Sequence, residues 1–450
     1  MLHANIKRLW GVLVLLPALI SMWPPSGVPK VAASNPADSI TVKPQLPAIP
    51  TRRFVATDYG AVGDGKHSNT EAFRKAIAAV KAAGGGQVVV PAGTFVTGPL
   101  ELTSKMALVL EKGATIRGSE DFADYQTSDG KVIPLIAGRK LTDVAIKGEG
   151  TIDGAGAPWW KRFRAERAAG VPQQGQPRVA GQPQETPRPK LVLFTDCANI
   201  LIQGITLKDA PQFHLVPQRC HDVTIENVTV TAPADSPNTD GIDPSSSREV
   251  LISHCTIDVG DDNVAFKSNP GDGPTENVLV TDCTFKHGHG ASVGSNIGGG
   301  IRNILVQNCS FDGGDNGIRI KSARDRGGLV ENIEYRNITM RNVGYAITLN
   351  LFYFDKVAQQ ERKASAVTAT TPIVRGVRIV NVTVQGAKTA GDIIGLPEMP
   401  IDTVTLDNVR VDANTGLTVQ DANGVILRQV HIVPQKGDPV KIINAQVKTQ

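Results

Sequence analysis

Three carboxylates and one imidazole stand in short polar segments that interrupt apolar, alternating stretches of this chain. They are Asp240 in "SPNTDGID", Asp261 and Asp262 in "GDD", and His289 in "GHG". A protonated carboxyl group can protonate a leaving oxygen while an ionised one activates water, and crowding raises the pKa of at least one of them. Each segment alone is equally typical of a turn, because Asn, Asp, Ser, Pro and Gly favour turns.

Cations follow in the segment "RIK", which places Arg319 and Lys321 two residues apart. Side chains at that spacing share one face of a strand. Two cations on one face fit a substrate that carries carboxylates, and Arg can bind a carboxylate with two hydrogen bonds. A solvated strand face is the other interpretation of this pair. Lys267, in the strand segment after "GDD", is a further candidate for substrate binding.

The elements that must position these residues are internal repeats. From about residue 199 one phrase recurs, and the second residue of each copy marks its register: 200, 223, 250, 278, 304, 333, 377, 404 and 425. Most steps between marks are 21 to 29 residues, too short for a strand and a crossover helix. Each copy alternates apolar and polar residues, as strands do. We therefore expect an all-β fold, a single-stranded right-handed parallel β-helix, or solenoid, whose coils bury one another's inner faces.

The register brings the polar candidates together. Asp261 and His289 each lie 11 residues past their marks (261 − 250 and 289 − 278), which predicts that they stand on neighbouring coils. Each coil has a second strand, and the candidates lie just before or on these strands, at 241–243, 263–268, 291–295, 317–322 and 345–350. Strands stack about 4.8 Å apart, so the column spans roughly 15–20 Å, which suits a polymer lying along the axis.

The same register gives structural roles to the cysteines and several asparagines. Cys255, Cys283 and Cys309 share a column with apolar residues, which indicates small core side chains. A ladder of side chains at a bend is expected for Asn227, Asn308, Asn337, Asn381 and Asn408. Five cysteines cannot form a complete disulfide framework, and there is no C-x-x-C spacing. We expect no metal and no cofactor.

The first residues predict export. Lys7 and Arg8 precede an apolar run, and "VAAS" offers small residues for cleavage, with a signal peptide over 1–33. The run ends too soon for a confident membrane span, so we expect a secreted or periplasmic protein without a stable span; an uncleaved anchor is the alternative. Residues 34–51 read as a Pro-rich linker to a β-helix domain at 52–440.

Three segments should depart from the coil pattern. Residues 69–86 have apolar residues at helical spacing, Asn69 or Thr70 as a possible N-cap and Gly84 as a stop, which predicts a short N-terminal capping helix. Residues 156–190 and about 355–372 are expected to be loops at one edge. The net charge of +4 is small, and the sequence has no basic run with interleaved aromatic residues, so we expect no nucleic-acid binding. We expect a monomer.

At "NTD" (238–240), "GDD", "GHG" and "RIK", in this order on successive repeats, the chain resembles glycoside hydrolase family 28, the polygalacturonases and related pectin hydrolases. The resemblance covers roughly 52–435. It implies inverting hydrolysis of α-1,4-linked galacturonic acid in pectin. It assigns Asp261 as general acid, Asp240 and Asp262 as positioning and deprotonating water, His289 as support for the acid, Arg319 and Lys321 as carboxylate ligands, and Asn238 and Tyr345 as substrate contacts.

Several alternatives stay open from sequence. Family branches that cut rhamnogalacturonan or xylogalacturonan are one, although "GHG" and "RIK" point to galacturonan. A pectate lyase and a non-catalytic polysaccharide-binding β-helix are others. Asn263 departs from many fungal members, which have Cys after "GDD". The segments 156–190 and 355–372 could close one end of a cleft, which favours exo over endo action. The role of Asp243 is not separable from structure.

Overall fold

The computed structural model describes residues 40–172, 185–353 and 355–450. The expected signal peptide at 1–33 and its cleavage site lie outside the described residues and stay predictions. Among the described residues, no helix has the length and apolar character that crossing a membrane requires.

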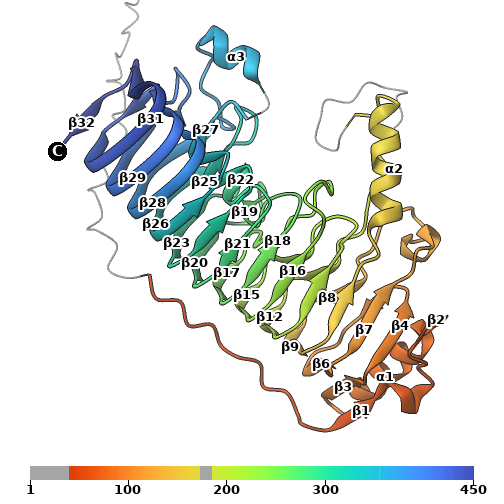
Figure 1. Ribbon diagram of the computed structural model, residues 1–450. Coiled ribbons are helices and arrows are strands. Elements are labelled where there is room, and N and C mark those ends of the chain that lie inside the picture. Colours follow the sequence, from red (N-terminus) through yellow and green to blue (C-terminus); the bar gives the residue numbers. More distant parts are fainter. Residues whose placement is uncertain (1–39, 173–184, 354) are drawn as a thin grey trace, which may run out of the picture. The chain divides into compact units, whose positions relative to one another are not determined.

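Parallel strands of successive coils pair with one another and form a right-handed parallel β-helix (Figure 1). The register marks of the repeats are direct partners in this pairing. They form one column through Ile200, Val223, Val250, Val278, Ile304, Ile333, Val377 and Val404. All of these side chains are buried, so the alternation seen in sequence is the alternation between core and surface.

Each coil contributes strands to three faces. The first face carries the register marks, with β1 (Arg53–Val55), β3 (Gly86–Val90), β6 (Met106–Leu110), β9 (Thr142–Gly148), β12 (Ala198–Gln203), β15 (His221–Glu226), β17 (Arg248–Ser253), β20 (Thr275–Thr281) and β23 (Ile301–Gln307). The second face holds β2 (Asp64–Ser68), β4 (Gly93–Thr97), β7 (Ala114–Gly118), β10 (Thr151–Asp153), β13 (Thr206–Lys208), β16 (Thr229–Thr231), β18 (Thr256–Asp258), β21 (Thr284–Phe285) and β24 (Ser310–Asp312).

The third face holds the strands expected to present the polar candidates. It runs through β5 (Leu100–Glu101), β8 (Ile136–Arg139), β11 (Val192–Thr195), β14 (Leu215–Gln218), β19 (Val264–Ser268), β22 (Ala291–Ile297), β25 (Asn316–Lys321) and β27 (Tyr345–Asn350). Between β14 and β19, Ile242 bridges Leu215 and Val264, so the face is continuous across the "GID" stretch.

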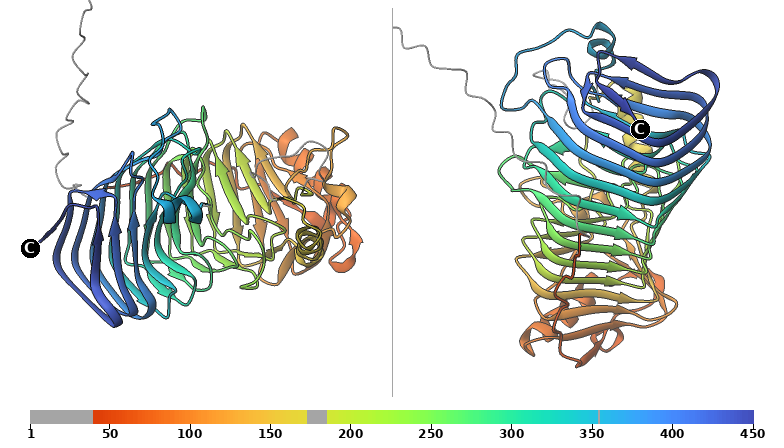
Figure 2. Two further views of the ribbon diagram at one scale, coloured as in Figure 1. Left: turned by 90° about the horizontal axis from the view of Figure 1, so that it is seen from above. Right: turned by 90° about the vertical axis from the view of Figure 1, so that its left-hand side faces the viewer.

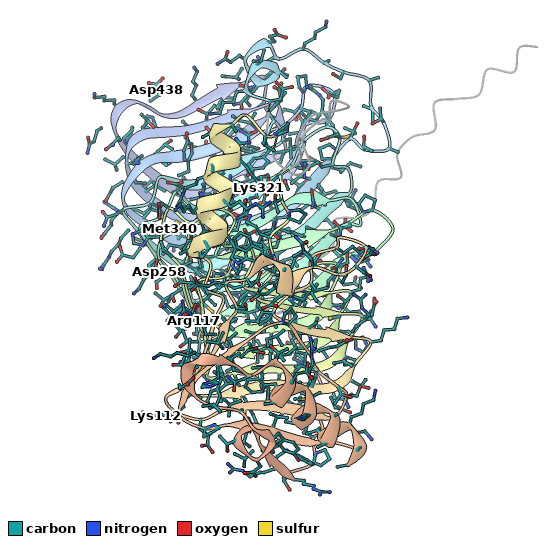
Figure 3. The ribbon with its side chains drawn as sticks, turned by 90° about the vertical axis from the view of Figure 1, so that its right-hand side faces the viewer. Lys112, Arg117, Asp258, Lys321, Met340 and Asp438 are labelled. Atoms are coloured by element: carbon teal, nitrogen blue, oxygen red, sulfur yellow. The ribbon has the colours of Figure 1, made fainter. Side chains whose placement is uncertain are left out.

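Later coils are built from longer strands that continue through the bends. They are β26 (Leu329–Arg341), β28 (Ile373–Ile394), β29 (Ile401–Gln420) and β31 (Val425–Ile443), with the short β30 (Ala422–Asn423) and β32 (Val447–Thr449) beside them. Figure 2 shows these coils stacked on the earlier ones, and in Figure 3 Lys112, Asp258 and Asp438 mark successive levels along the stack.

The expected asparagine ladder is present at one bend. The Nδ2 atom of each residue donates to Oδ1 of the one before: Asn337 to Asn308 at 3.0 Å, Asn381 to Asn337 at 3.1 Å and Asn408 to Asn381 at 2.9 Å. These residues have φ between 52° and 55°, a left-handed conformation that Asn tolerates better than most residues. Asn227 has the same conformation, outside this bonded run. The sharp bend requires a left-handed residue at each level, and the ladder provides hydrogen-bond partners for the asparagine side chains there.

The thiols are core side chains, as expected. Cys197, Cys220, Cys255, Cys283 and Cys309 are all buried and free. The capping helix is also confirmed as α1 (Thr70–Ala82), which buries Phe73, Ile77 and Val80 over the first coils. Asn69 precedes it, but its side chain accepts from the amide of Val62 rather than capping the helix.

The expectation of plain loops at 156–190 and 355–372 was wrong in part. The first contains α2 (Ala157–Ala168), which buries Trp159, Trp160 and Phe163; the second contains α3 (Lys356–Glu361). Both helices project from the same side of the β-helix (Figures 1 and 2). The flanking chain is rich in Pro, Gln and Arg, so the average composition of the segment is that of a loop. Buried aromatic residues hold α2 in place. Short 3₁₀ turns are η1 (Ala56–Tyr59) and η2 (Phe122–Tyr125).

The described part of the expected linker packs against the β-helix. The backbone amides of Gln45 and Ala48 donate to the carboxylates of Asp222 and Asp143, both at 3.0 Å, and Val42 is buried. Residues 40–51 thus contribute to the fold, although their Pro-rich composition is typical of a free linker.

Candidate active site

The turns that lead into the third face bring the candidate carboxylates onto neighbouring coils. The amide of Gly241 donates to the carbonyl of Asp262 at 2.9 Å, and the amide of His289 donates to the carbonyl of Asp261 at 2.9 Å. Equal spacing from the register marks therefore predicted the adjacency of Asp261 and His289. The turn that carries Asp240 lies directly beside the "GDD" coil.

Asp261 and His289 form a hydrogen-bonded pair. The His289 Nδ1 atom lies 3.0 Å from Oδ1 of Asp261, and Nε2 lies 3.3 Å from Oδ2 of Asp315. Burial alone would raise the pKa of Asp261, but the hydrogen bond and charge of His289 hold it below its usual range. Burial opposes the imidazolium, yet Asp261 raises the pKa of His289 above its usual value. The contact therefore favours a protonated imidazole beside an ionised carboxylate.

Asp262 is bound by two cations of β25, which lies two coils further along the β-helix. Its Oδ2 accepts from Lys321 Nζ at 2.6 Å, and its Oδ1 lies 3.3 Å from an Arg319 nitrogen. Ser292 Oγ donates to the same Oδ1 at 2.8 Å. The carboxylate is almost fully buried, and its lone pairs are well satisfied. The two cations expected to bind substrate therefore also neutralise a candidate catalytic carboxylate.

Asp240 and Asp243 share a single cation. Lys267 Nζ donates to Oδ2 of Asp240 at 2.7 Å and to Oδ2 of Asp243 at 2.6 Å. Among the described residues, neither Oδ1 atom has a hydrogen-bond partner. Burial raises the pKa of Asp240 well above its usual value and that of Asp243 to about 6, although Lys267 opposes both shifts. Lys267, expected to bind substrate, is paired with both of these carboxyl groups in this structure.

A residue that sequence reasoning missed orients Asn238. Arg188 is buried and donates to Oδ1 of Asn238 at 2.7 Å and to the carbonyl of Pro237 at 2.8 Å. Its guanidinium lies 4.1 Å from the ring centroid of Phe163 on α2. The Asn238 amide then lies 3.4 Å from Oδ2 of Asp261. Only the Arg-rich composition of 156–190 hinted at this link between α2 and the site.

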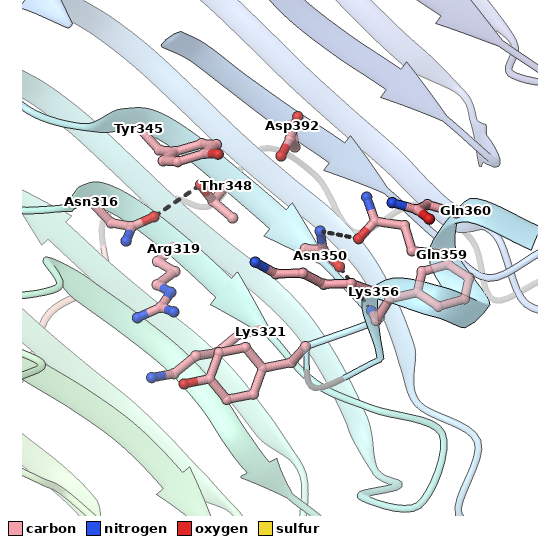
Figure 4. Close-up of a pocket in the computed structure, with 12 residues that line it drawn as sticks. Asn316, Arg319, Lys321, Tyr345, Thr348, Asn350, Lys356, Gln359, Gln360 and Asp392 are labelled. Carbon is pink, nitrogen blue, oxygen red and sulfur yellow. Dashed lines mark hydrogen bonds between the residues drawn. The ribbon is translucent and has the colours of Figure 1, made fainter. Parts of the chain in front are cut away.

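A pocket of about 390 Å³ adjoins these cations on the third face (Figure 4). Arg319 and Lys321 form one side, and their charged groups lie 5.3 Å and 5.1 Å from the ring centroid of Tyr353. Tyr345 lines the pocket and is 43% exposed, which leaves its ring open to a ligand. The structure thus brings every site residue predicted from sequence into one connected cluster or its adjoining pocket.

The ligand atoms of Asp261, Asp262 and His289 lie within 4.8 Å of one another, a spacing that could hold a cation. Lys321 and Arg319 already donate to both oxygens of Asp262, and positive side chains beside a carboxylate disfavour a metal ion there. The arrangement fits acid and base catalysis better than metal binding.

Comparisons with known proteins identify the family of this chain. The model of glycosyl hydrolases family 28 matches residues 81–426. A probable polygalacturonase of Vitis vinifera is 31% identical over 380 residues, covering 79% of this chain and 73% of that protein. An endo-polygalacturonase of Pectobacterium parmentieri is 31% identical over 349 residues, covering 73% of this chain and 80% of that protein.

Solved structures share the fold. The exopolygalacturonase of Thermotoga maritima has a TM-score of 0.73 at 29% identity, covering 85% of this chain and 93% of that one. The polygalacturonase of Erwinia carotovora superposes with a TM-score of 0.65 at 23% identity, covering 90% and 98%. With its four polar motifs on consecutive coils, this chain belongs to glycosyl hydrolases family 28 and is a glycoside hydrolase.

Proposed function

We propose that this protein hydrolyses α-1,4-galacturonosyl linkages of polygalacturonan with inversion at the anomeric carbon. The observation that carries the proposal is the arrangement of three carboxylates beside a cation pair. Asp261 is backed by His289, and Asp262 is bound by Arg319 and Lys321 from the coils where a uronate would lie. Such a site offers an acid, a base and counter-ions for carboxylates.

Asp261 acts as the general acid in this proposal, although its own pKa is low in the free protein. The proton resides on His289, 3.0 Å away, so it can pass from Nδ1 to the Asp261 carboxyl and on to the leaving oxygen. A uronate entering the site adds negative charge and excludes water, and both changes raise the pKa of Asp261. Substrate binding would therefore place the proton where the chemistry needs it.

Asp240 and Asp262 orient and deprotonate the attacking water. Lys267 donates to the buried Asp240, and Lys321 donates to Asp262, so each of these carboxyl groups has a cation beside it. Asp240 also has an oxygen, Oδ1, without a hydrogen-bond partner among the described residues, and such an atom can accept from a water molecule. The water would then be activated opposite the acid.

Substrate binding falls to residues around the pocket. Arg319 and Lys321 would share a uronate carboxylate with Asp262, Asn238 would contact the sugar in an orientation set by Arg188, and Tyr345 would stack on it. Exo action is proposed because α3 forms a wall of the pocket, and a similar structure is an exopolygalacturonase. We further propose an exported, monomeric enzyme without a cofactor.

The test is a product analysis on polygalacturonate, with rhamnogalacturonan and xylogalacturonan as parallel substrates. We expect new reducing ends, β-anomeric products at early times, and no rise in ultraviolet absorbance. Monomer as the only early product would support exo action, and a ladder of oligomers would establish endo action. A retained anomer would overturn inversion, and unsaturated products would establish a lyase.

A further inference from the structure

Helix α3 forms one wall of the pocket and is tied at both ends by hydrogen bonds. The Asp355 side chain accepts the amide of Ala358 at 2.8 Å and caps the helix. At the other end Arg362 donates to Oδ1 of the fully buried Asp421 at 2.8 Å. Buried partners hold this wall, so the side chains that α3 presents to the pocket have a defined position.

The chain just beyond α3 is anchored as well. Arg324 donates to the carbonyl of Lys363 at 3.0 Å, and its guanidinium also binds the Glu398 carboxylate at 2.6 Å and 3.1 Å. Together with the Arg362–Asp421 contact, this ties the segment to the rest of the chain at two points.

Lys356 is a cation on this wall without a counter-ion among the described residues. It lines the pocket, and Figure 4 shows it reaching from α3 across the pocket toward Arg319. Arg319 and Lys321 differ from it, because both are committed to Asp262 at 3.3 Å and 2.6 Å. The positive charge that stands ready for a further anionic group is therefore that of Lys356.

The remaining lining groups fit the hydroxyl groups of a sugar. The Asn350 Nδ2 atom lies 3.4 Å from Oε1 of Gln359, and Gln360 and Asp392 stand nearby in the pocket. These groups offer donors and acceptors, and the exposed ring of Tyr345 offers a face for stacking. Polar groups around one cation and aromatic walls match a single uronic acid unit.

We propose that this pocket is a subsite for a second uronate, next to the one held by Arg319 and Lys321, and that Lys356 is the counter-ion of its carboxylate. The proposal rests on the proposed function, because it assumes that the cleft binds a galacturonate chain. It assigns a specificity role to α3, which the four sequence motifs do not include.

The experiment compares Lys356→Met, which keeps the aliphatic stem and removes the charge, with two other variants. Lys356→Arg keeps the charge, and Lys363→Met removes a charge from the same exposed segment outside the pocket lining. We expect Lys356→Met to raise KM for oligogalacturonides about tenfold with kcat nearly unchanged, as loss of uniform binding does. Lys356→Arg should restore most of the affinity, and Lys363→Met should match the parent enzyme.

The chemistry of the second uronate gives the decisive control. With oligomers methyl-esterified only on the unit proposed to face Lys356, the KM of Lys356→Met and of the parent enzyme should differ less than twofold. Equal loss on both substrates would overturn the proposal, since it would indicate a structural role for Lys356. A KM of Lys356→Met equal to that of Lys363→Met on the acidic substrate would overturn it as well.

A binding measurement separates this inference from the proposed function. Calorimetric titration of trigalacturonate into Asp261→Asn, with and without Lys356→Met, reports the subsite without turnover. Absence of hydrolysis by the parent enzyme would overturn the proposed function alone if Lys356→Met still weakened binding about tenfold. Unchanged binding would overturn the subsite, whatever the activity of the parent enzyme.

Discussion

Two neighbouring pairs of aspartates in the site differ in the number of charged partners that bind them. In the first, Asp261 has His289 and Asp262 has Lys321 and Arg319, so each carboxylate has its own partner. In the second, Asp240 and Asp243 divide the single ammonium of Lys267. Both pairs are largely buried, yet the pKa of Asp261 lies below its usual range while those of Asp240 and Asp243 lie above it.

The difference indicates that a dedicated charge partner reverses the direction of the pKa shift that burial causes. Burial raises the pKa of all three of these carboxyl groups, and only a dedicated partner reverses the shift for Asp261. In the first pair, the contact favours a protonated imidazole beside an ionised carboxylate. In the second pair, burial raises the pKa of Asp240 well above its usual value and that of Asp243 to about 6, which favours protonated carboxyl groups.

The largest effect is expected for Asp261→Asn, which removes the acid and leaves the rest of its pair. We expect kcat on polygalacturonate to fall by about 10² to 10⁴, the usual range for general acid catalysis. An aryl galacturonide with a good leaving group should lose far less, because it needs little protonation. Asp312→Asn, at an exposed site on β24, is the matched control. Equal losses on both substrates would contradict the assignment of Asp261 as acid.

Lys267→Met should break the second pair by removing the ammonium group that hydrogen-bonds both of its carboxyl groups. Two buried carboxylates would then repel each other, so the pKa of Asp240 rises and the base ionises only at higher pH. We expect kcat/KM to fall by about 10 to 100-fold at pH 6, and the acidic limb of its pH profile to move upward. Lys286→Met, an exposed lysine, should leave the profile unchanged.

Stability is the concern for Lys267→Met, since breaking a buried ion pair can cost about 3–5 kcal/mol. Lys267→Arg keeps the charge and should retain the parent pH limb, with thermal unfolding measured in parallel. An acidic limb that stays in place in a folded Lys267→Met variant would show that Lys267 does not control Asp240.

His289→Gln tests where the first pair keeps its proton. The parent pair loses that proton at the raised pKa of the imidazole, whereas the variant must lose it from the Asp261 carboxyl group at lower pH. The alkaline limb of the kcat/KM profile should therefore move downward, with about a tenfold loss at pH 7. His287→Gln, two residues away and exposed, serves as control. A limb that moves upward would refute the shared proton.

Asp243→Asn should have the smallest effect, with a sign opposite to that of Lys267→Met. Without a second negative charge, Lys267 belongs to Asp240 alone, so the pKa of Asp240 falls. The acidic limb should move to lower pH, and kcat at pH 7 should change less than about threefold. An upward shift would mean that Asp243 stabilises ionised Asp240, and the comparison of the two pairs would fail.

The coil register and the contact of Asp261 with His289 were predictable because both depend on backbone periodicity alone. The apolar marks are direct strand partners, so equal offsets along the chain become neighbours in space. The same arithmetic carries a signal for Lys267: it lies 17 residues past its mark, as Lys321 does (267 − 250 and 321 − 304). That offset places the two lysines in one column of the third face.

The pairing of cations with particular carboxylates could not be predicted. Lys321 and Asp262 are 59 residues apart and come from different coils, and their contact depends on side-chain reach and on the lack of other neutralising groups. The link from α2 through Arg188 to Asn238 was hidden for another reason. Helix α2 is held by buried aromatic residues, but it lies in a segment whose average composition is typical of a loop, so composition did not indicate the helix.

The direct alignment of coil on coil has a consequence for how the binding surface can change length. Residues that do chemistry occupy a few consecutive coils, and the coils on either side repeat the same bends and core columns. Duplicating or deleting one outer coil would shift the cleft end by about 4.8 Å and leave the acid, base and cations in register. Evolution, or a designer, can thus adjust the number of sugars bound without rebuilding the catalytic centre.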